Sequence, residues 1–190
     1  MSVINHEFKH VFIHNPKAAG TAMESQKWVG GKGHATAAML CDKQPGYLSW
    51  AFVRHPLDRL VSAYHGLKEN PGHDTPDVDS MDFVKWVAYL WRGSPATTYH
   101  YAQTLPQWHY LYLRGECLVD FVGHYENLEA DYRAISKRIT GEPQPLDRRN
   151  QSTHAPYQAY YTAATIELAQ EIYAEDMRLW GYDKNERLRA

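Results

Sequence analysis

Two short apolar runs, each closed by a proline-containing turn and followed by a helical pattern, constrain the fold of this chain most. The first run is His10–His14, which leads into Asn15-Pro16. The second is Ser49–Val53, which leads into Arg54–Pro56. Apolar runs of this length that stop at a proline are typical of buried strands. Strand, turn and helix in repeated order predict a parallel sheet with helices on its faces.

The remaining patterns predict one domain over residues 1–190. A chain of 190 residues buries roughly 70% of the surface that its unfolded form exposes, so it holds a core without disulfides or metals. No repeat or linker divides the sequence. We expect helices at 22–29, from Pro56, at about 80–92, 126–140 and 162–180, a third strand at 118–122, and a long loop at 141–156.

Charge and composition exclude several classes of protein. The chain has 20 Lys and Arg residues and 22 Asp and Glu residues, which gives a net charge of −2. We therefore expect neither nucleic acid nor an anionic membrane surface as a partner. No apolar run approaches the ~18 residues of a membrane span. Cys41 and Cys117 are too few for a disulfide scaffold, although they could pair in the fold. Free thiols are the simpler interpretation and predict a cytoplasmic protein.

The segment Pro16–Thr21, between the first strand and its helix, has the chemistry of an anion site. Free backbone N–H groups at a helix start attract anions, and the small residues Ala18, Ala19 and Gly20 let an anion approach the backbone. Lys17 adds a positive charge and Thr21 a hydroxyl. Because Lys17 precedes the glycine, the segment is not the phosphate loop of ATP-binding proteins. An ordinary tight turn with a solvated lysine remains the alternative.

Arg54 and Ser62 form a second candidate element. Arg54 ends the second strand, and Ser62 lies two turns into the following helix. Both side chains suit one phosphate, which an arginine grips with two parallel hydrogen bonds. Ligands of parallel sheets bind at the carboxyl ends of the strands, so residues 15–21 and 54–56 are predicted to line one site. The alternative is a surface arginine and a surface serine.

Taken together, the segments Asn15–Thr21 and Phe52–Tyr64 resemble the two cofactor signatures of sulfotransferases. The closest similarity is to carbohydrate sulfotransferases of the heparan-sulfate 2-O type and to their small bacterial relatives. The resemblance continues over most of the chain, in Gly33–Thr36, Leu105–Leu111, Val119–Leu128, Tyr160–Thr162 and Tyr173–Asp176.

The resemblance implies a fold like that of the P-loop nucleoside triphosphatases, with three layers (α/β/α) around a central parallel sheet. It also implies the donor 3′-phosphoadenosine 5′-phosphosulfate (PAPS), the product adenosine 3′,5′-bisphosphate (PAP), and no metal. The family pattern assigns the 5′-phosphosulfate to the segment Pro16, Lys17, Ala18, Ala19, Gly20, Thr21 and Ala22, the 3′-phosphate to Arg54 and Ser62, and closure over the nucleotide to Ser152, Thr153 and Tyr157. Ala18 and Ala22 stand where the family usually or often has hydroxyl side chains, which predicts weaker donor binding.

Sulfuryl transfer needs charge stabilisation and a base. By analogy with phosphoryl transfer, Lys17 is expected to stabilise the charge that grows on the leaving phosphate. The acceptor hydroxyl must also lose its proton. His34, in the Gly33–Thr36 motif, stands where relatives carry a proposed base. Glu24, on the helix after the loop, is the second candidate.

The sequence therefore favours a sulfotransferase that acts on a hydroxyl of a carbohydrate or a small metabolite, with residues 66–80 and 93–110 facing the acceptor. A P-loop nucleotide kinase is one alternative, and a nucleotide-binding module without catalysis is another. His6, His10 and His14 recur every four residues, as on the metal-binding face of a helix. A strand over 10–14 breaks that spacing, so a metal site is not expected.

Overall fold

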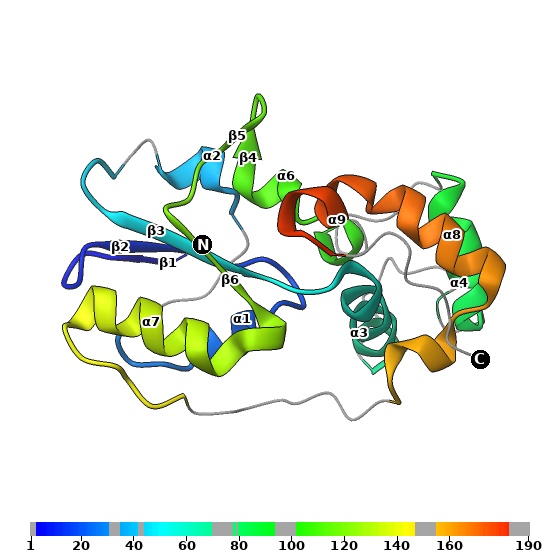
Figure 1. Cartoon of the computed structure of the whole chain (residues 1–190), viewed down its shortest axis with the longest axis horizontal. Helices are drawn as coiled ribbons and strands as arrows, with labels where there is room; N and C mark the ends of the chain where they lie inside the picture. Colours follow the sequence, from blue (N-terminus) through cyan, green and yellow to red (C-terminus); the bar gives the residue numbers. More distant parts are fainter. Residues whose placement is uncertain are drawn as a thin grey trace. The chain divides into compact units, whose positions relative to one another are not determined.

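The computed structural model describes residues 3–30, 35–41, 44–69, 78, 80–93, 102–146 and 155–182 (Figure 1). They form a mixed α/β fold in two compact units. Unit 1 comprises Met1–Arg54 and Gln107–Gln151, and unit 2 comprises His55–Pro106 and Ser152–Ala190. One functional domain over residues 1–190 stays a prediction, because the compactness of each unit does not decide whether either folds without the other.

Unit 1 is built on a four-stranded sheet in the order β1-β2-β3-β6. The strands β2 (His10–Ile13), β3 (Leu48–Val53) and β6 (Phe121–His124) run parallel, as the repeated strand–turn–helix pattern predicts. The edge strand β1 (Val3–Asn5) pairs antiparallel with β2 and was not predicted. Three residues give too short a pattern to be recognised as a strand from sequence alone.

Ser49 and Asp120 fix the register between β3 and β6. The Asp120 carboxylate accepts hydrogen bonds from the Ser49 amide (2.8 Å) and hydroxyl (2.7 Å), and the Asp120 amide donates to the Ser49 hydroxyl (3.1 Å). Regular pairing then begins one residue later, with Trp50 opposite Phe121. A backbone bond from the Asp120 N–H to the Ser49 carbonyl (3.0 Å) accompanies these side-chain bonds. The third strand spans 121–124, so the expected 118–122 was placed too early.

The first helix, α1 (Gly20–Glu24), is shorter and earlier than the predicted 22–29. Its end is set by side chains. The Ser25 hydroxyl and the Gln26 amide both donate to the Ala22 carbonyl at 2.8 Å, which competes with continuation of the helix. The Trp28 carbonyl in turn accepts hydrogen bonds from side chains of β1 and β2. The segment after Glu24 therefore turns toward the sheet instead of continuing as a helix.

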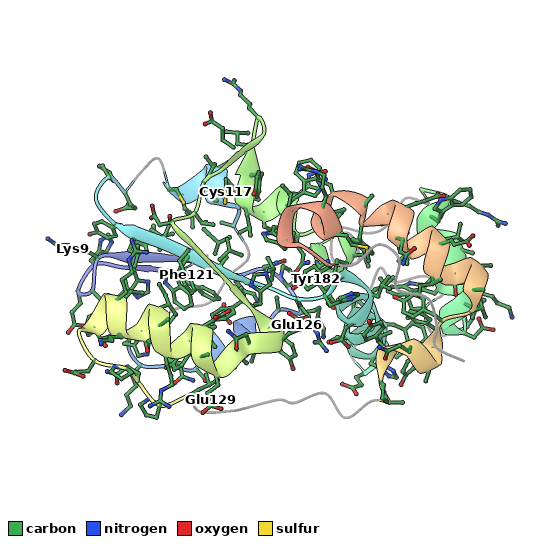
Figure 2. The ribbon with its side chains drawn as sticks, viewed as in Figure 1. Lys9, Cys117, Phe121, Glu126, Glu129 and Tyr182 are labelled. Atoms are coloured by element: carbon green, nitrogen blue, oxygen red, sulfur yellow. The ribbon has the colours of Figure 1, made fainter. Side chains whose placement is uncertain are left out.

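The core of unit 1 lies between the sheet and two helices. Phe12, Trp50 and Phe52 share a buried cluster with Met23 of α1 and Tyr132 of α7. The helix α7 (Leu128–Thr140) follows a 3₁₀ turn, η2 (Tyr125–Asn127), so it begins two residues later than predicted. Figure 1 shows α1 and α7 on one side of the sheet, and Figure 2 shows Glu129 pointing outward from α7.

A small helix–hairpin group completes the described part of unit 1. The helix α2 (Ala37–Leu40) packs against α6 (Trp108–Leu111) and β4 (Tyr112–Leu113), and β4 pairs antiparallel with β5 (Glu116–Cys117). These elements of two to four residues were not predicted, because each is too short to show a period. Cys41 and Cys117 are both free thiols, as expected.

Unit 2 is helical in its described residues. It contains α3 (Pro56–Glu69), α4 (Phe83–Trp91), η3 (Tyr157–Tyr160), α8 (Ala163–Ile172) and α9 (Ala174–Trp180). The start of α3 at Pro56 confirms the prediction. The expected helix 162–180 is interrupted at Tyr173, whose buried hydroxyl donates to the Thr104 carbonyl at 2.7 Å. The backbone at Tyr173 (φ −108°, ψ 22°) departs from helical values where its side chain makes this long-range bond, and no local pattern indicates the break.

His10 is a buried neutral histidine, and this predicts acid sensitivity. Its Nδ1 accepts from the Trp50 indole (3.1 Å), so the proton lies on Nε2, which donates to the Trp28 carbonyl (3.0 Å). Burial lowers its pKa below the ordinary 6.5, against the raising effect of the Trp28 bond. Below pH 6.5 the unfolded chain therefore binds a proton that the folded chain does not, so stability falls as pH falls.

We expect His10→Gln to lower the free energy of unfolding at neutral pH but to weaken its further decline between about pH 7 and pH 5. Urea unfolding of both proteins at the two pH values, followed by the fluorescence of the buried tryptophans, measures this difference. Because both proteins contain the other histidines, comparison with the wild type cancels their contribution to the pH dependence of stability. An equal decline in both proteins would show that His10 does not titrate on unfolding.

Candidate functional site

The carboxyl ends of three parallel strands bring the predicted residues of unit 1 together. β2 leads into Asn15–Ala19, β3 into Arg54, and β6 into Tyr125. Because the three strands are parallel neighbours, these segments lie at the same edge of the sheet. The sequence predicted the first two segments for this edge and did not assign a role to Tyr125.

The loop after β2 has an unusual backbone. Lys17 (φ 65°) and Ala19 (φ 64°) are both left-handed, whereas Ala18 between them is not. Such conformations cost non-glycine residues about 1–3 kcal/mol each and persist only where the surroundings impose them. Residues of alternating hand turn successive backbone N–H groups toward one side, and such concavities bind anions. Within this loop the Ala18 N–H donates to the Asn15 carbonyl at 3.3 Å, and the use of the loop as an anion site stays a prediction.

A buried hydrogen bond between His14 and Glu24 joins α1 to the end of β2. His14 Nδ1 lies 2.7 Å from Glu24 Oε1, and the two side chains are only 8% and 10% exposed. The imidazole lies against the start of the helix: a Cβ at Gly20 would stand 1.9 Å from His14 Nε2. Gly20 is thus required for the close approach of this ring. Glu24, the second candidate base, is held by His14, and its catalytic role stays a prediction.

Arg54 joins the loops that follow the three parallel strands. It is 5% exposed, and its guanidinium carbon lies 4.2 Å from the centre of the Tyr125 ring. Its Nη1 donates to the Lys17 carbonyl at 3.4 Å. Its backbone N–H and carbonyl are both bonded to the Gln107 side chain at 2.9 Å. The arginine is therefore a positioned cation at this edge and not a solvated surface residue.

The other predicted site residues are distributed as follows. Thr21 and Ala22 lie in α1, directly after the loop. Ser62 belongs to unit 2, where it is 5% exposed on α3. Tyr157 also belongs to unit 2, and its ring stacks on His55 with the centres 5.1 Å apart. His34, Ser152 and Thr153 lie outside the described residues.

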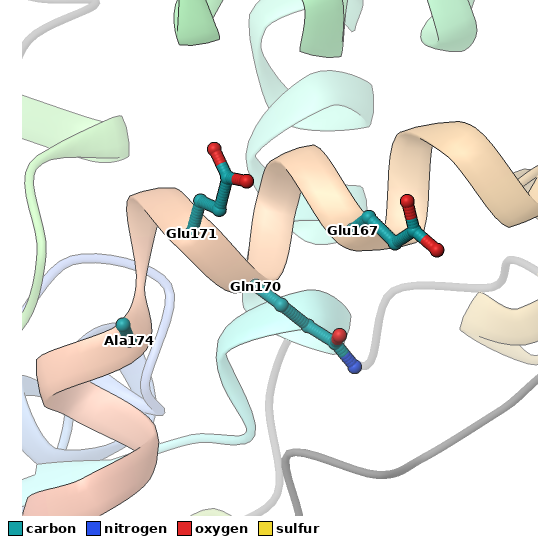
Figure 3. Close-up of a pocket in the computed structure, with 4 residues that line it drawn as sticks. All are labelled: Glu167, Gln170, Glu171 and Ala174. Carbon is teal, nitrogen blue, oxygen red and sulfur yellow. The ribbon is translucent and has the colours of Figure 1, made fainter.

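Unit 2 has an open hollow on the surface of α8 and α9. It encloses about 330 Å³ and is lined by Glu167, Gln170, Glu171 and Ala174 (Figure 3). Glu171 accepts a hydrogen bond from the Trp91 indole at 2.7 Å. Two carboxylates without a cation among the lining residues disfavour a phosphate there. Among the described residues, no three His, Cys, Asp or Glu side chains gather as a metal site would need.

Comparison with known proteins shows the family of this chain. A model of the sulfotransferase family matches residues 3–183. The chain belongs to this family. This sulfotransferase is also similar to an uncharacterized protein of Archaeoglobus fulgidus, with 32% identity over 104 residues, which is 55% of this chain and 76% of that protein. No solved structure matches the chain.

Family membership confirms the resemblance to sulfotransferases that the sequence showed. It places the protein among the enzymes that transfer sulfuryl groups. Within the described ranges of this sulfotransferase, every helix is too short or too polar to cross a bilayer. Sequence reasoning did not single out Tyr125 or Gln107 as site residues. Both lie in segments that resemble the family, Val119–Leu128 and Leu105–Leu111, and that position was the only signal available for them.

The contact between Gly20 and His14 yields a test of the loop architecture. We expect Gly20→Ala to lower the free energy of unfolding by about 1–3 kcal/mol, because the added methyl group overpacks against the imidazole. Helix propensity alone predicts the opposite sign, since alanine is a better helix former than glycine. Urea unfolding measures the difference.

The control is His14→Ala, which removes the imidazole. In the His14→Ala background, Gly20→Ala should cost nothing further, because the methyl group then has room. Equal losses from Gly20→Ala in both backgrounds would contradict the steric explanation.

Proposed function

We propose that this protein transfers the sulfuryl group of PAPS to a hydroxyl of a carbohydrate or a small metabolite, without a metal. The observation that carries the proposal is the pairing of a left-handed loop at Lys17 with a buried Arg54 at one sheet edge. An anion-binding backbone and a fixed cation suit a nucleotide that has phosphates at two positions. Family membership supplies the reaction class.

We also propose the three-layer fold of the P-loop nucleoside triphosphatases, with residues 1–190 as one sulfotransferase domain. Two facts support this. β2, β3 and β6 are parallel neighbours. Side chains on both faces of the central strands are buried, since Val11, Ile13, Ala51 and Val53 are at most 1% exposed, as are Phe12, Trp50 and Phe52. Sheets buried on both faces are covered by helices on both faces.

The donor is assigned to three groups of residues. The segment Pro16–Ala22 holds the 5′-phosphosulfate through the Lys17 side chain and the backbone N–H groups of its residues other than proline. Arg54 and Ser62 hold the 3′-phosphate, and Ser152, Thr153 and Tyr157 close over the nucleotide. PAPS, when bound, supplies the sulfuryl group and leaves as PAP. Ala18 and Ala22 offer no hydroxyl, so the loop relies on backbone N–H groups and Lys17 for this anion.

The residues of this chain then divide the chemistry. His34 takes the proton of the acceptor hydroxyl as a new S–O bond forms to that oxygen. Lys17 stabilises the negative charge that develops on the bridging phosphate oxygen as the old S–O bond breaks. Arg54 anchors the nucleotide away from the reacting centre. Glu24 is the next candidate for the base if His34 is not the proton acceptor.

Nucleotide selectivity tests the donor assignment. We expect isothermal titration to give at least about tenfold tighter binding of PAP than of ATP, because only PAP offers a 3′-phosphate to Arg54. Arg54→Gln should weaken the binding of PAP by about 10- to 100-fold, the usual cost of losing hydrogen bonds to a charged group. The affinity for ATP should stay nearly unchanged. Arg138→Ala, at the exposed far end of α7, is the matched control. ATP binding equal to or tighter than PAP binding would instead favour the nucleotide kinase.

Kinetics separate the base from the donor-binding residues. We expect His34→Ala to lower turnover by roughly 10²–10⁴-fold, the range for a lost general base, with PAP affinity unchanged. Lys17→Ala should weaken PAPS binding and slow transfer together, because it contacts the group in transfer. Turnover assays with labelled donor, alongside PAP titrations, measure both. Unchanged turnover in His34→Ala removes His34 as the base, and PAP binding without turnover on any acceptor favours the non-catalytic module.

A further inference from the structure

Gln107 is a fully buried glutamine within the Leu105–Leu111 segment, and the donor assignment gives it no role. It is 0% exposed and immediately precedes α6. Its side-chain oxygen accepts from the Arg54 backbone N–H at 2.9 Å, and its side-chain amide donates to the Arg54 carbonyl at 2.9 Å. One side chain thus satisfies both main-chain groups of Arg54, as a neighbouring strand would.

These two hydrogen bonds to Arg54 begin where the backbone pairing of the sheet ends. The last paired residue of β3 is Val53, opposite His124. Buried main-chain groups beyond a ladder need other partners, and Gln107 provides them for Arg54. The backbone limits which rotamers an arginine side chain can adopt. Gln107 therefore fixes the backbone from which the Arg54 guanidinium reaches the Tyr125 ring and the Lys17 carbonyl.

The same glutamine is tied to the loop after β2. The Gln107 oxygen also accepts from Asn15 Nδ2 at 3.0 Å, and Asn15 Nδ2 donates to the Phe52 carbonyl at 3.1 Å. Asn15 is 1% exposed and lies two residues before the left-handed Lys17. The network Asn15–Gln107–Arg54 therefore connects the two proposed phosphate-binding elements through buried hydrogen bonds.

We propose that Gln107 is a positioning residue that sets the separation between the Lys17 loop and Arg54, and so selects a nucleotide with both a 5′- and a 3′-phosphate. This inference rests on the proposed donor. The two phosphates of such a nucleotide are joined through one ribose, so their separation is confined to a narrow range. A misplaced Arg54 backbone lowers affinity for the pair of phosphates even where each cation is still present.

Gln107→Glu is the sharpest test, because its effect should depend on pH. At about pH 8 the carboxylate still accepts from Arg54 N–H and Asn15, but it cannot donate to the Arg54 carbonyl and repels it. Burial favours the protonated form, which donates to that carbonyl as the amide does. We expect PAP to bind about tenfold more weakly than to the wild type at pH 8, and nearly as tightly at about pH 5.

Each affinity is expressed as a ratio to the wild type at the same pH, which cancels the titration of PAP itself. Gln144→Glu is the matched control, since the Gln144 amide also donates to a backbone carbonyl, that of Glu142. Gln144 follows the far end of α7, a 13-residue helix that extends about 1.5 Å per residue. This control should keep a ratio near one at both pH values.

Gln107→Met keeps the test decisive if the glutamate variant fails to fold at pH 8. Methionine has a similar length and no charge, so we expect a folded protein that binds PAP about tenfold more weakly at both pH values. Affinity is measured at temperatures where unfolding curves show each variant fully folded. A purely structural role would lower the unfolding temperature and leave the affinity of the folded protein unchanged.

The outcomes separate the two proposals. The positioning role is supported if the wild type binds PAP, Gln107→Met binds it more weakly, and the PAP affinity of Gln107→Glu recovers from pH 8 to pH 5. If the wild type binds PAP and folded Gln107→Met binds it with unchanged affinity, the positioning role is overturned and the donor assignment stands. No PAP binding by the wild type overturns the donor assignment, and with it the selection that this inference describes.

Discussion

The parallel pairing of β3 with a strand on each side decides where the chemistry of unit 1 lies. Because β2, β3 and β6 run in the same direction, Asn15, Arg54 and Tyr125 all follow strand ends at one edge. An antiparallel β6 would carry Tyr125 to the opposite edge. The Ser49–Asp120 bonds set the register of β3 and β6 at their other end. The arginine–tyrosine contact therefore depends on hydrogen bonds at the far edge of the sheet.

Strain and close packing in the loop after β2 are balanced by buried contacts around it. Left-handed Lys17 and Ala19 each cost about 1–3 kcal/mol, and the His14–Glu24 pair holds the short helix that follows. In the proposed function, a loop fixed in this way is preorganised for the 5′-phosphosulfate, so donor binding does not have to order it. The same rigidity explains why Gly20 tolerates no side chain: the imidazole that anchors α1 occupies that space.

The positive charge that the proposed site uses comes from a few positioned side chains and not from an excess of basic residues. With a net charge of −2, the chain offers no general attraction to a polyanion. Arg54 is nearly buried, and its guanidinium is held by an aromatic ring and a carbonyl, so its charge is concentrated at one edge of the sheet. By contrast, the hollow on α8 carries Glu167 and Glu171. In the proposed reaction, phosphate recognition therefore depends on a few positioned groups and not on the field of the whole molecule.

The sequence by itself determined β2, β3, the start of α3 and the placement of Lys17 and Arg54 after β2 and β3, because apolar runs, prolines and charged residues at strand ends are local signals. Tertiary structure decided the end of α1, the break at Tyr173 and the contacts of Tyr125, because each depends on side-chain bonds or contacts that form only in the folded chain. Gln107 is the clearest case. Its amide meets Arg54, 53 residues away in sequence, and no local pattern marks a glutamine whose partner is another residue's backbone.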